Sequence, residues 1–237
     1  MTDRPYTVLS AAISLDGYLD GGPGQPLPLS SPTDLDRVDD VRAGCDAILV
    51  GAATVRQDNP RLLVRSAARQ DRRITEGRPP TPTKVTITRS GDLDPSACFF
   101  TTGEDKIVYC GGDAFSRTRE RLGAAATVVD GGALDLQGIA ADLFERGIRR
   151  LLVEGGGSTH TQFLTGDQAD ELQLVVAPCF VGGGRATRFA EDGRYPWHPG
   201  RRAWLAEVRR LEDVVLLRYA LSPRFEDHEL GFTLGEV

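Results

Sequence analysis

The chain alternates between short apolar runs and polar segments that are rich in glycine and proline. Apolar runs of about four to eight residues with turn residues at both ends are typical of buried strands. Such runs predict strands over residues 6–13, 45–50, 84–88, 106–110, 126–130, 151–153, 171–178, 203–211 and 214–221. The last two flank Leu211-Glu212-Asp213, so we expect them to form an antiparallel hairpin.

Apolar residues three or four positions apart predict helices between these strands. Ser31 and Pro32 mark one helix start, as N-cap and first helical residue, and the apolar spacing carries this helix through Ala43. Further helices are expected over a short stretch after residues 51–54, weakly around 114–122, and over 136–147 and 158–165.

Polar segments without periodicity predict loops. The glycine- and proline-rich residues 20–32 and the arginine-rich residues 66–83 are expected to be loops, and residues 190–201 an irregular excursion. Residues 61–65 are expected to continue as an extended piece with an arginine at each end. The acidic tail from Ser222 is expected at the surface.

Strands with interspersed helices, without a repeat or a long linker, indicate one three-layer α/β domain in the 237 residues, with its core at about 6–221. A net charge of −6 gives no sign of a general nucleic-acid or membrane binder. No apolar run reaches membrane-spanning length and the N-terminus lacks a signal-peptide pattern, so we expect a cytoplasmic protein. The four cysteines are scattered and are expected to be reduced thiols.

Three expected strand-to-helix turns are rich in small residues, at 51–54, 154–159 and 181–185. Such turns suit an anion, because glycines let backbone N–H groups approach it and a helix start adds partial positive charge. A phosphate-bearing nucleotide is therefore favoured, and a glycine-rich connection without a ligand is the alternative. No GxGxxG fingerprint or P-loop signature is present, which argues against a Rossmann dinucleotide fold.

Three acids, Asp16, Asp58 and Glu154, fall at expected strand ends or short turns. In a shared cleft one of them could act as a proton donor, and the alternative is that they cap helices or accept backbone N–H bonds. We expect Glu154 and Thr54 to lie at one common edge of the sheet, where open α/β folds bind their ligands.

Arg42, Arg61 and Arg65 could clamp a substrate phosphate, although solvated arginines are common. The histidines, at positions 160, 198 and 228, share no ligand spacing, so no metal site is expected. No GxSxG elbow or Cys/His arrangement points to a hydrolase.

Several motifs occur in the order of a known family. They are SLDGY at 14–18, AILVGAATVRQDNPRLLVR at 47–65, RRLLVEGGGSTHTQFL at 149–164 and DELQLVVAPCFVGGG at 170–184. This pattern resembles the reductase domain of the bifunctional riboflavin-biosynthesis deaminase–reductase, in the dihydrofolate-reductase-like superfamily. No zinc deaminase signature lies upstream, so a stand-alone reductase domain is expected.

The resemblance implies a three-layer fold with a mixed, mostly parallel central sheet, a C-terminal antiparallel hairpin and helices on both faces. It also implies NADPH as hydride donor and a pyrimidine ribosylamine 5′-phosphate as substrate, reduced at C1′ from ribosyl to ribityl. By motif match, the cofactor side comprises Ala12, Gly51, Thr54, Asp58, Thr88, Arg89, Ser90, Gly155, Gly156, Gly157, Ser158 and Thr159. The substrate side comprises Arg42, Leu62, Arg65 and Glu154. Asp58 and Glu154 are the catalytic candidates, and Arg89 beside the 2′-phosphate would favour NADPH over NADH.

Two departures from the family pattern bear on the substrate. Many members have lysine where this chain has Ser10, and Trp-Ile-Thr-Ser where it has Pro28-Leu29-Ser30-Ser31. A reductase of a pterin or of another carbonyl or imine compound is therefore the first alternative. A non-catalytic nucleotide-binding protein is the second. The family also implies a homodimer, to which the hairpin at 203–221 could contribute.

Overall fold

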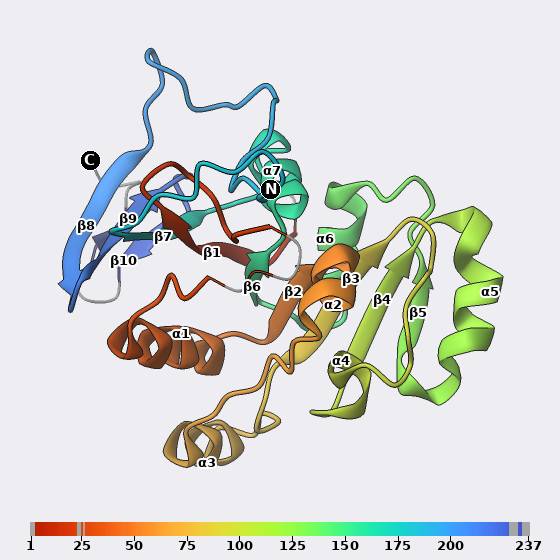
Figure 1. Ribbon diagram of the computed structural model, residues 1–237. Coiled ribbons are helices and arrows are strands. Elements are labelled where there is room, and N and C mark those ends of the chain that lie inside the picture. The colour runs from red at the N-terminus through yellow and green to blue at the C-terminus, as the bar shows by residue number, and fades with distance from the viewer. Residues whose placement is uncertain (1–2, 23–24, 26, 228–231, 234–237) are drawn as a thin grey trace. The chain divides into compact units, whose positions relative to one another are not determined.

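The computed structural model describes residues 3–22, 25, 27–227 and 232–233 (Figure 1). The chain forms two compact units: Met1–Pro5 with Asp36–Gly156, and Tyr6–Leu35 with Gly157–Val237. Parts of the expected loop 20–32 and of the expected acidic tail lie outside the described residues, namely 23–24, 26, 228–231 and 234–237.

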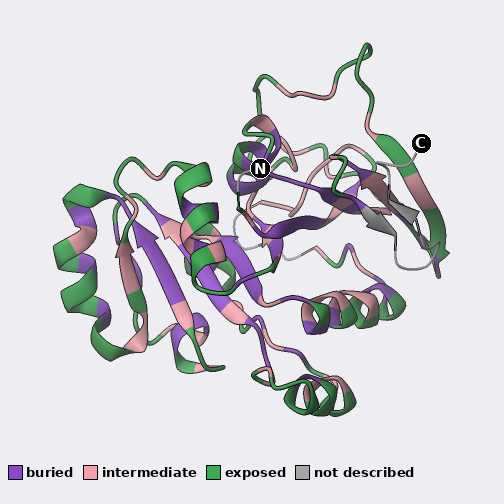
Figure 2. Ribbon diagram, turned by 180° about the vertical axis from the view of Figure 1, so that it is seen from behind, coloured by how far each residue is buried: buried purple, intermediate pink, exposed green. Residues whose placement is uncertain are grey.

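The first unit is built on five parallel strands in the order β5-β4-β3-β2-β6. Their bounds are β2 Ala47–Gly51, β3 Thr83–Thr88, β4 Lys106–Cys110, β5 Thr127–Asp130 and β6 Arg150–Gly155. β2 lies between β3 and β6, and its residues Ala47–Val50 are buried (Figure 2). Burial on both faces explains why β2 is a continuous apolar run. The five strands that the sequence predicts in this unit are confirmed.

Helices connect these strands. They are α1 Pro32–Gly44, α2 Ala52–Asp58, α3 Ala67–Thr75, α4 Cys98–Thr101, α5 Gly112–Leu122 and α6 Leu136–Glu145, with a 3-10 turn at Gly123–Ala125. The predicted start of α1 is confirmed, because Ser31 Oγ accepts a hydrogen bond from the Asp34 amide at 3.2 Å. The short α2 ends at Asn59, which takes the left-handed conformation with φ of 45°.

The prediction of an exposed loop over 66–83 is wrong, because α3 occupies Ala67–Thr75 and β3 begins at Thr83. Ser66 caps α3 by accepting from the Arg69 amide at 3.4 Å. Arg73 is 1% exposed and donates to three backbone carbonyls, those of Ala43, Cys45 and Pro79. An arginine that bonds carbonyls brought together only by folding gives no apolar periodicity, so the sequence pattern does not reveal this helix.

Residues 61–65 also differ from the extended piece that the sequence predicts. Leu62 has a φ of 50° and its side chain is buried. The left-handed region is uncommon for a residue with a Cβ, so the chain turns at Leu62 under the constraint of its surroundings.

The second unit contains four strands in the order β1-β7-β9-β8: β1 Tyr6–Ser14, β7 Glu171–Ala177, β9 Val214–Ala220 and β8 Trp204–Leu211. β1 and β7 run parallel, whereas β7, β9 and β8 pair antiparallel. This confirms the predicted strands and the C-terminal hairpin. A core cluster that includes Leu29, Val175 and Leu216 lies on one face of this sheet.

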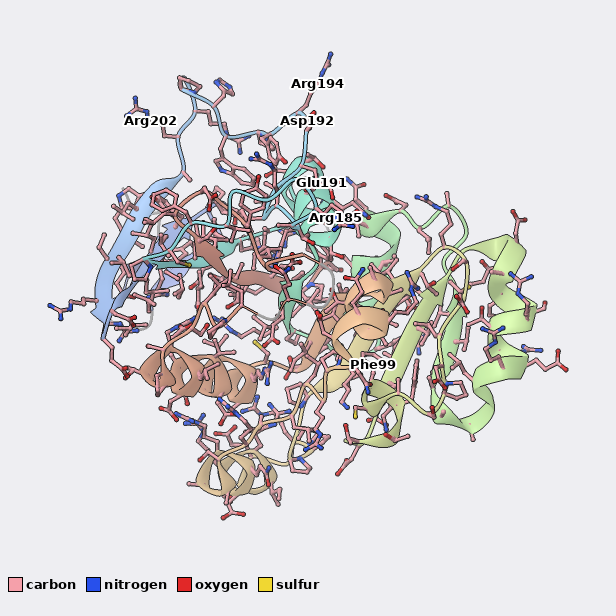
Figure 3. All side chains as sticks on the ribbon, in the orientation of Figure 1. Phe99, Arg185, Glu191, Asp192, Arg194 and Arg202 are labelled. Carbon is pink, nitrogen blue, oxygen red and sulfur yellow. The ribbon has the colours of Figure 1, made fainter. Side chains whose placement is uncertain are left out.

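Helix α7 (Gly157–Thr165) is the helix of the second unit that the sequence predicts. No helix follows the glycine turn at 181–185 among the described residues, so that turn is not a strand-to-helix connection. Residues 190–201 are irregular as predicted, and Asp192 and Arg194 point outward from them in Figure 3. Phe225, in the segment expected at the surface, is fully buried, and Glu226–Asp227 (β10) pairs with Phe232–Thr233 (β11). Among the described helices, none has the length and apolar character needed to cross a membrane.

Candidate active site

The carboxyl ends of β2, β3 and β6 meet at one edge of the first unit's sheet. Gly51 pairs with Ile87 of β3, and Val50 pairs with Gly155 of β6. Thr54 lies in the first turn of α2, directly after β2. The predicted common edge for Glu154 and Thr54 is therefore present.

Glu154 occupies an irregular position in β6. Leu49 pairs with Val153 and Val50 with Gly155, so Glu154 is the additional residue of a β-bulge. A bulge leaves its extra residue outside the regular ladder and redirects its side chain. Gly156, which follows with a φ of 79°, allows the tight turn after the strand.

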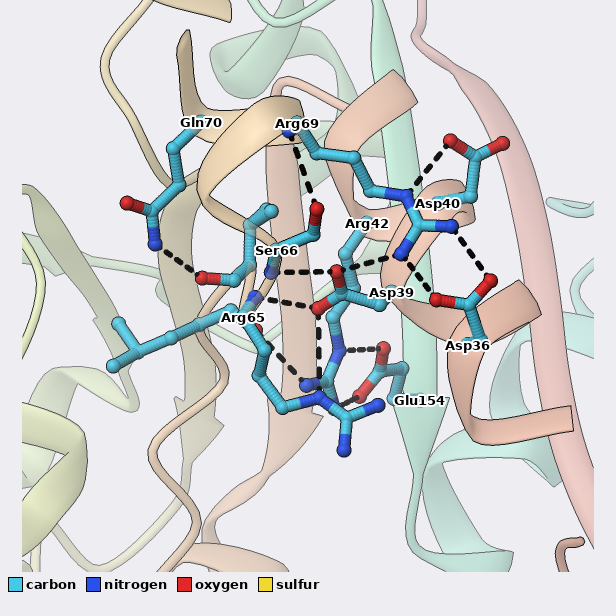
Figure 4. A network of polar contacts seen from close by, with 11 residues as sticks. Asp36, Asp39, Asp40, Arg42, Arg65, Ser66, Arg69, Gln70 and Glu154 are labelled. Atoms are coloured by element: carbon cyan, nitrogen blue, oxygen red, sulfur yellow. Dashed lines mark hydrogen bonds and ion pairs between the residues drawn. The ribbon is translucent and has the colours of Figure 1, made fainter. Parts of the chain in front are cut away.

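Arg42 of α1 donates two parallel hydrogen bonds to Glu154 (Figure 4). Nε donates to Oε1 and Nη2 donates to Oε2, each at 2.6 Å, while Nη1 donates to the Leu63 carbonyl at 3.2 Å. The side chains are 19% and 11% exposed. Burial lowers the pKa of Arg42, but the charge and hydrogen bonds of Glu154 outweigh burial and raise it. Arg42, expected on the phosphate of a substrate, thus presents one edge of its guanidinium to Glu154.

Leu62 and Arg65, the other expected substrate residues, lie on the irregular segment between α2 and α3. Leu62 is 5% exposed, whereas the Arg65 side chain is 55% exposed. Arg61, at the other end of the predicted pair of arginines, is exposed. Arg61 and Arg65 are therefore both accessible cations on the segment that Arg42 holds at Leu63.

Thr88 ends β3 at the same edge of the sheet, and Arg89 and Ser90 follow it. Thr88 is buried and its Oγ1 accepts from the Gly91 amide at 3.0 Å, while Arg89 and Ser90 are exposed. A Cβ on Gly91 would lie 1.8 Å from Thr118 Oγ1, and its φ is 68°. Only glycine fits there, so the turn that presents Arg89 and Ser90 has a defined shape.

A pocket of about 380 Å³ opens beside Arg89. Its lining comprises Arg89, Gly111, Gly112, Asp113, Asp130, Gly132, Ala133 and Leu134. Of these only Arg89 was singled out from the sequence. The signal for the others was present, because Cys110-Gly111-Gly112-Asp113 is a further strand end followed by glycines and a helix.

Residues expected on the cofactor side also occur in the second unit. Ala12 of β1 pairs with Val175 of β7. Helix α7 begins at Gly157, so Ser158 and Thr159 lie in its first turn. Ser158 is exposed, and Thr159 is 9% exposed. A Cβ on Gly157 would lie 2.0 Å from the Arg188 carbonyl oxygen, so this helix start requires glycine.

The remaining acids separate into two kinds. Ser14 Oγ donates to Asp16 at 2.6 Å, and the amides of Val181 and Gly182 donate to it as well. These bonds lower the pKa of Asp16 to about 2, and the bond from Ser14 has the largest effect. Asp16 therefore accepts backbone N–H bonds in a turn, which is the alternative to a proton donor that the sequence leaves open. Asp58 is the exposed last residue of α2.

Parallel strands that end in glycine turns, followed by an antiparallel hairpin, define a mixed α/β protein with the fold of RibD-like reductases. Within this class the chain belongs to the RibD C-terminal domain family, whose model matches residues 5–217.

The sequences of curated relatives align with most of the chain. It is 33% identical over 182 residues to the 2,5-diamino-6-ribosylamino-4(3H)-pyrimidinone 5′-phosphate reductase of Archaeoglobus fulgidus, over 76% of this chain and 83% of that protein. It is 33% identical over 192 residues to the reductase of the same name from Methanothermobacter thermautotrophicus, over 80% of this chain and 85% of the relative.

Solved structures confirm the predicted fold class. A diaminohydroxyphosphoribosylaminopyrimidine deaminase/5-amino-6-(5-phosphoribosylamino)uracil reductase from Thermotoga maritima matches with a TM-score of 0.74 at 25% identity, over 92% of this chain and 56% of that one. A pyrimidine reductase-like protein from Corynebacterium diphtheriae matches with a TM-score of 0.75 at 23% identity, over 91% of each chain.

Proposed function

We propose that this chain is an NADPH-dependent reductase of a pyrimidine ribosylamine 5′-phosphate in riboflavin biosynthesis, converting the ribosyl group to ribityl by hydride transfer to C1′. The printed names of the relatives support this substrate class. The structural observation that supports it is the Arg42–Glu154 pair. Glu154 lies in a β-bulge of β6, beside the carboxyl end of β2.

The pocket beside Arg89 fits the phosphate-bearing end of NADPH. Gly111, Gly112 and Gly132 contribute no side chain to its lining, so a ligand can approach the backbone there, and a Cβ on Gly111 would lie 3.3 Å from the Arg89 carbonyl oxygen. The guanidinium of Arg89 suits a 2′-phosphate, and Asp113 and Asp130 suit ribose hydroxyls. We propose that the other cofactor contacts are the residues named by motif match, including Thr54 and Asp58.

When bound, NADPH supplies the hydride. Glu154, oriented by its two hydrogen bonds from Arg42, accepts a hydrogen bond from a substrate hydroxyl or amine and fixes the sugar carbon for attack. Arg65 pairs with the 5′-phosphate, and Leu62 packs against the pyrimidine. Asp58 adds negative charge on the cofactor side of the reacting carbon.

A pterin or another carbonyl or imine compound is the second candidate substrate. Ser10 is 6% exposed in β1, where many family members have lysine. Residues 28–32, which include the departure from Trp-Ile-Thr-Ser, line a pocket of about 830 Å³ in the second unit. Complementation separates the two candidates: rescue of a riboflavin auxotroph supports the pyrimidine, and rescue of a folate-reductase-deficient strain alone supports the pterin.

We propose that both units belong to one reductase domain, because the family match at 5–217 runs through both. We further propose a cytoplasmic location. The four cysteines, all within the described residues, are free thiols, which suits a reducing compartment. Proteolysis that releases two separately folded pieces without loss of activity would contradict the single domain.

We propose a homodimer that forms through one sheet face of the second unit. Along β7 the residues alternate between buried and half-buried, and the half-buried set is Leu172, Leu174 and Val176. The register continues this face through Leu217 of β9 to Val208 of β8, which is 60% exposed. A partly exposed apolar face is stabilised when an apolar surface covers it. In a two-fold dimer the same face of a second copy would supply that surface.

Light scattering on the purified chain tests the dimer. Val208→Glu is expected to give a monomer, because it places a charge within the apolar face. Ile74→Glu, at a residue 55% exposed on α3 of the other unit, is the matched control and should remain dimeric. A monomeric wild type contradicts the proposal.

A further inference from the structure

Asp39 of α1 is a buried carboxylate whose partners all come from one segment, residues 65–69 (Figure 4). Oδ1 accepts from the Arg65 amide at 2.6 Å, and Oδ2 accepts from the Ser66 amide at 3.1 Å and from Arg69 Nη1 at 3.1 Å. Arg65 Nε lies 3.5 Å from Oδ1. The Asp39 side chain is 2% exposed.

The segment between α2 and α3 needs such an anchor. Residues 59–66 belong to no helix or strand, and both Asn59 and Leu62 take positive φ angles. The Arg65 and Ser66 amides, which donate hydrogen bonds to Asp39, lie at the start of α3. The helix dipole also favours a negative charge there. Burial raises the pKa of Asp39, but its backbone and arginine hydrogen bonds outweigh burial and lower it, so the carboxylate is ionised.

Arg42 lies three residues further along α1, on the same face of the helix. It donates to the Leu63 carbonyl and holds Glu154. One face of α1 therefore fixes the segment at Leu63, Arg65 and Ser66, and fixes the bulged glutamate as well.

We propose that Asp39 is a positioning residue for the substrate: it sets the place of Leu62 and Arg65 relative to Glu154 by holding the backbone at residues 65 and 66. This inference rests on the proposed function, because Leu62 and Arg65 are the proposed substrate contacts. Asp39 itself touches no substrate, and its effect is transmitted through the backbone it binds.

The test compares Asp39→Asn with Asp40→Asn. Asp40 also lies on α1, but it is 56% exposed and accepts from the side chains of Arg69 and Arg72, each at 3.2 Å. The two variants remove the same charge. Asn at 39 replaces one acceptor oxygen by an amide group that cannot accept from Ser66 or Arg69.

Asp39→Asn is expected to raise KM for the phosphorylated pyrimidine by roughly tenfold or more, since charge-assisted bonds are lost, and to leave KM for NADPH within about twofold. Asp39→Glu, which keeps the charge, should recover part of the loss. Hydrogen exchange should show faster exchange of the Arg65 and Ser66 amides in Asp39→Asn and unchanged exchange in Asp40→Asn.

The outcomes separate two failures. An active wild type with equal substrate KM values for the two variants overturns the role of Asp39 alone. A wild type that reduces no pyrimidine substrate overturns the proposed function, and this role with it. If Asp39→Asn lowers kcat, raises KM for both the pyrimidine and NADPH, and lowers the melting temperature, Asp39 has a structural role. That result also overturns the proposal.

Discussion

Removal of Arg42 should expose how strongly the site depends on its ion pair. In Arg42→Met the carboxylate of Glu154, 11% exposed, loses two hydrogen bonds of 2.6 Å and stays in place. A buried charge left without its partner costs about 3 kcal/mol. The Leu63 carbonyl loses its donor as well. For a chain of 237 residues this corresponds to a fall in melting temperature of roughly 6–12 °C.

Urea unfolding followed by tryptophan fluorescence measures this loss in a double-mutant cycle. Arg42→Met should be less stable than the double variant Arg42→Met/Glu154→Gln, because the second substitution removes the stranded charge. Arg42→Lys keeps the positive charge but cannot form the two-pronged contact, and should lie between wild type and Arg42→Met. Unfolding free energies that simply add, with no coupling between the two positions, would refute the reasoning.

Two further variants test other parts of the site, and a third tests a buried histidine of α7. Arg89→Ala should weaken binding of NADPH more than of NADH, and an equal effect on both would remove Arg89 from the 2′-phosphate. Arg65→Ala should raise KM for a phosphorylated substrate about tenfold or more while sparing its dephosphorylated analogue, since one charge-assisted contact contributes roughly 1.5–3 kcal/mol. His160 is buried, and burial lowers its pKa to about 4, so the unfolded chain binds the proton more readily. The contribution of neutral His160 to the free energy of unfolding is therefore fully present above pH 6.5 and falls by about 3 kcal/mol as the pH drops toward 4. In acid unfolding, His160→Leu should lose less stability than the wild type over this range.

Much of the fold follows from local patterns. Strand β2 is buried on both faces, so its apolar run stands out, and the cap at Ser31 depends on residues within one helical turn. Helix α3 differs, because Arg73 and Arg69 gain their partners only when the chain has folded. A polar helix stabilised by distant carbonyls and carboxylates looks like a loop in the sequence.

The site shows the same division. The carboxyl ends of β2 and β6 could be placed together from the strand pattern, and they are adjacent. The pairing of Arg42 with Glu154 could not be predicted, because the two residues are 112 positions apart and no pattern links them. Asp39 is likewise one acid among several on α1, and its burial and its bonds from the Arg65 and Ser66 amides, which only the fold creates, distinguish it from Asp36 and Asp40.

The central claim is that this chain transfers hydride from NADPH to the sugar of a phosphorylated pyrimidine. The most direct measurement mixes the purified chain with NADPH and a pyrimidine ribosylamine 5′-phosphate and follows the nicotinamide absorbance and the product by mass spectrometry. We expect one NADPH to be consumed for each ribityl product, with no consumption when the substrate is left out. Binding of NADPH without any substrate-dependent oxidation, in both the aminated and the deaminated pyrimidine, would contradict the claim.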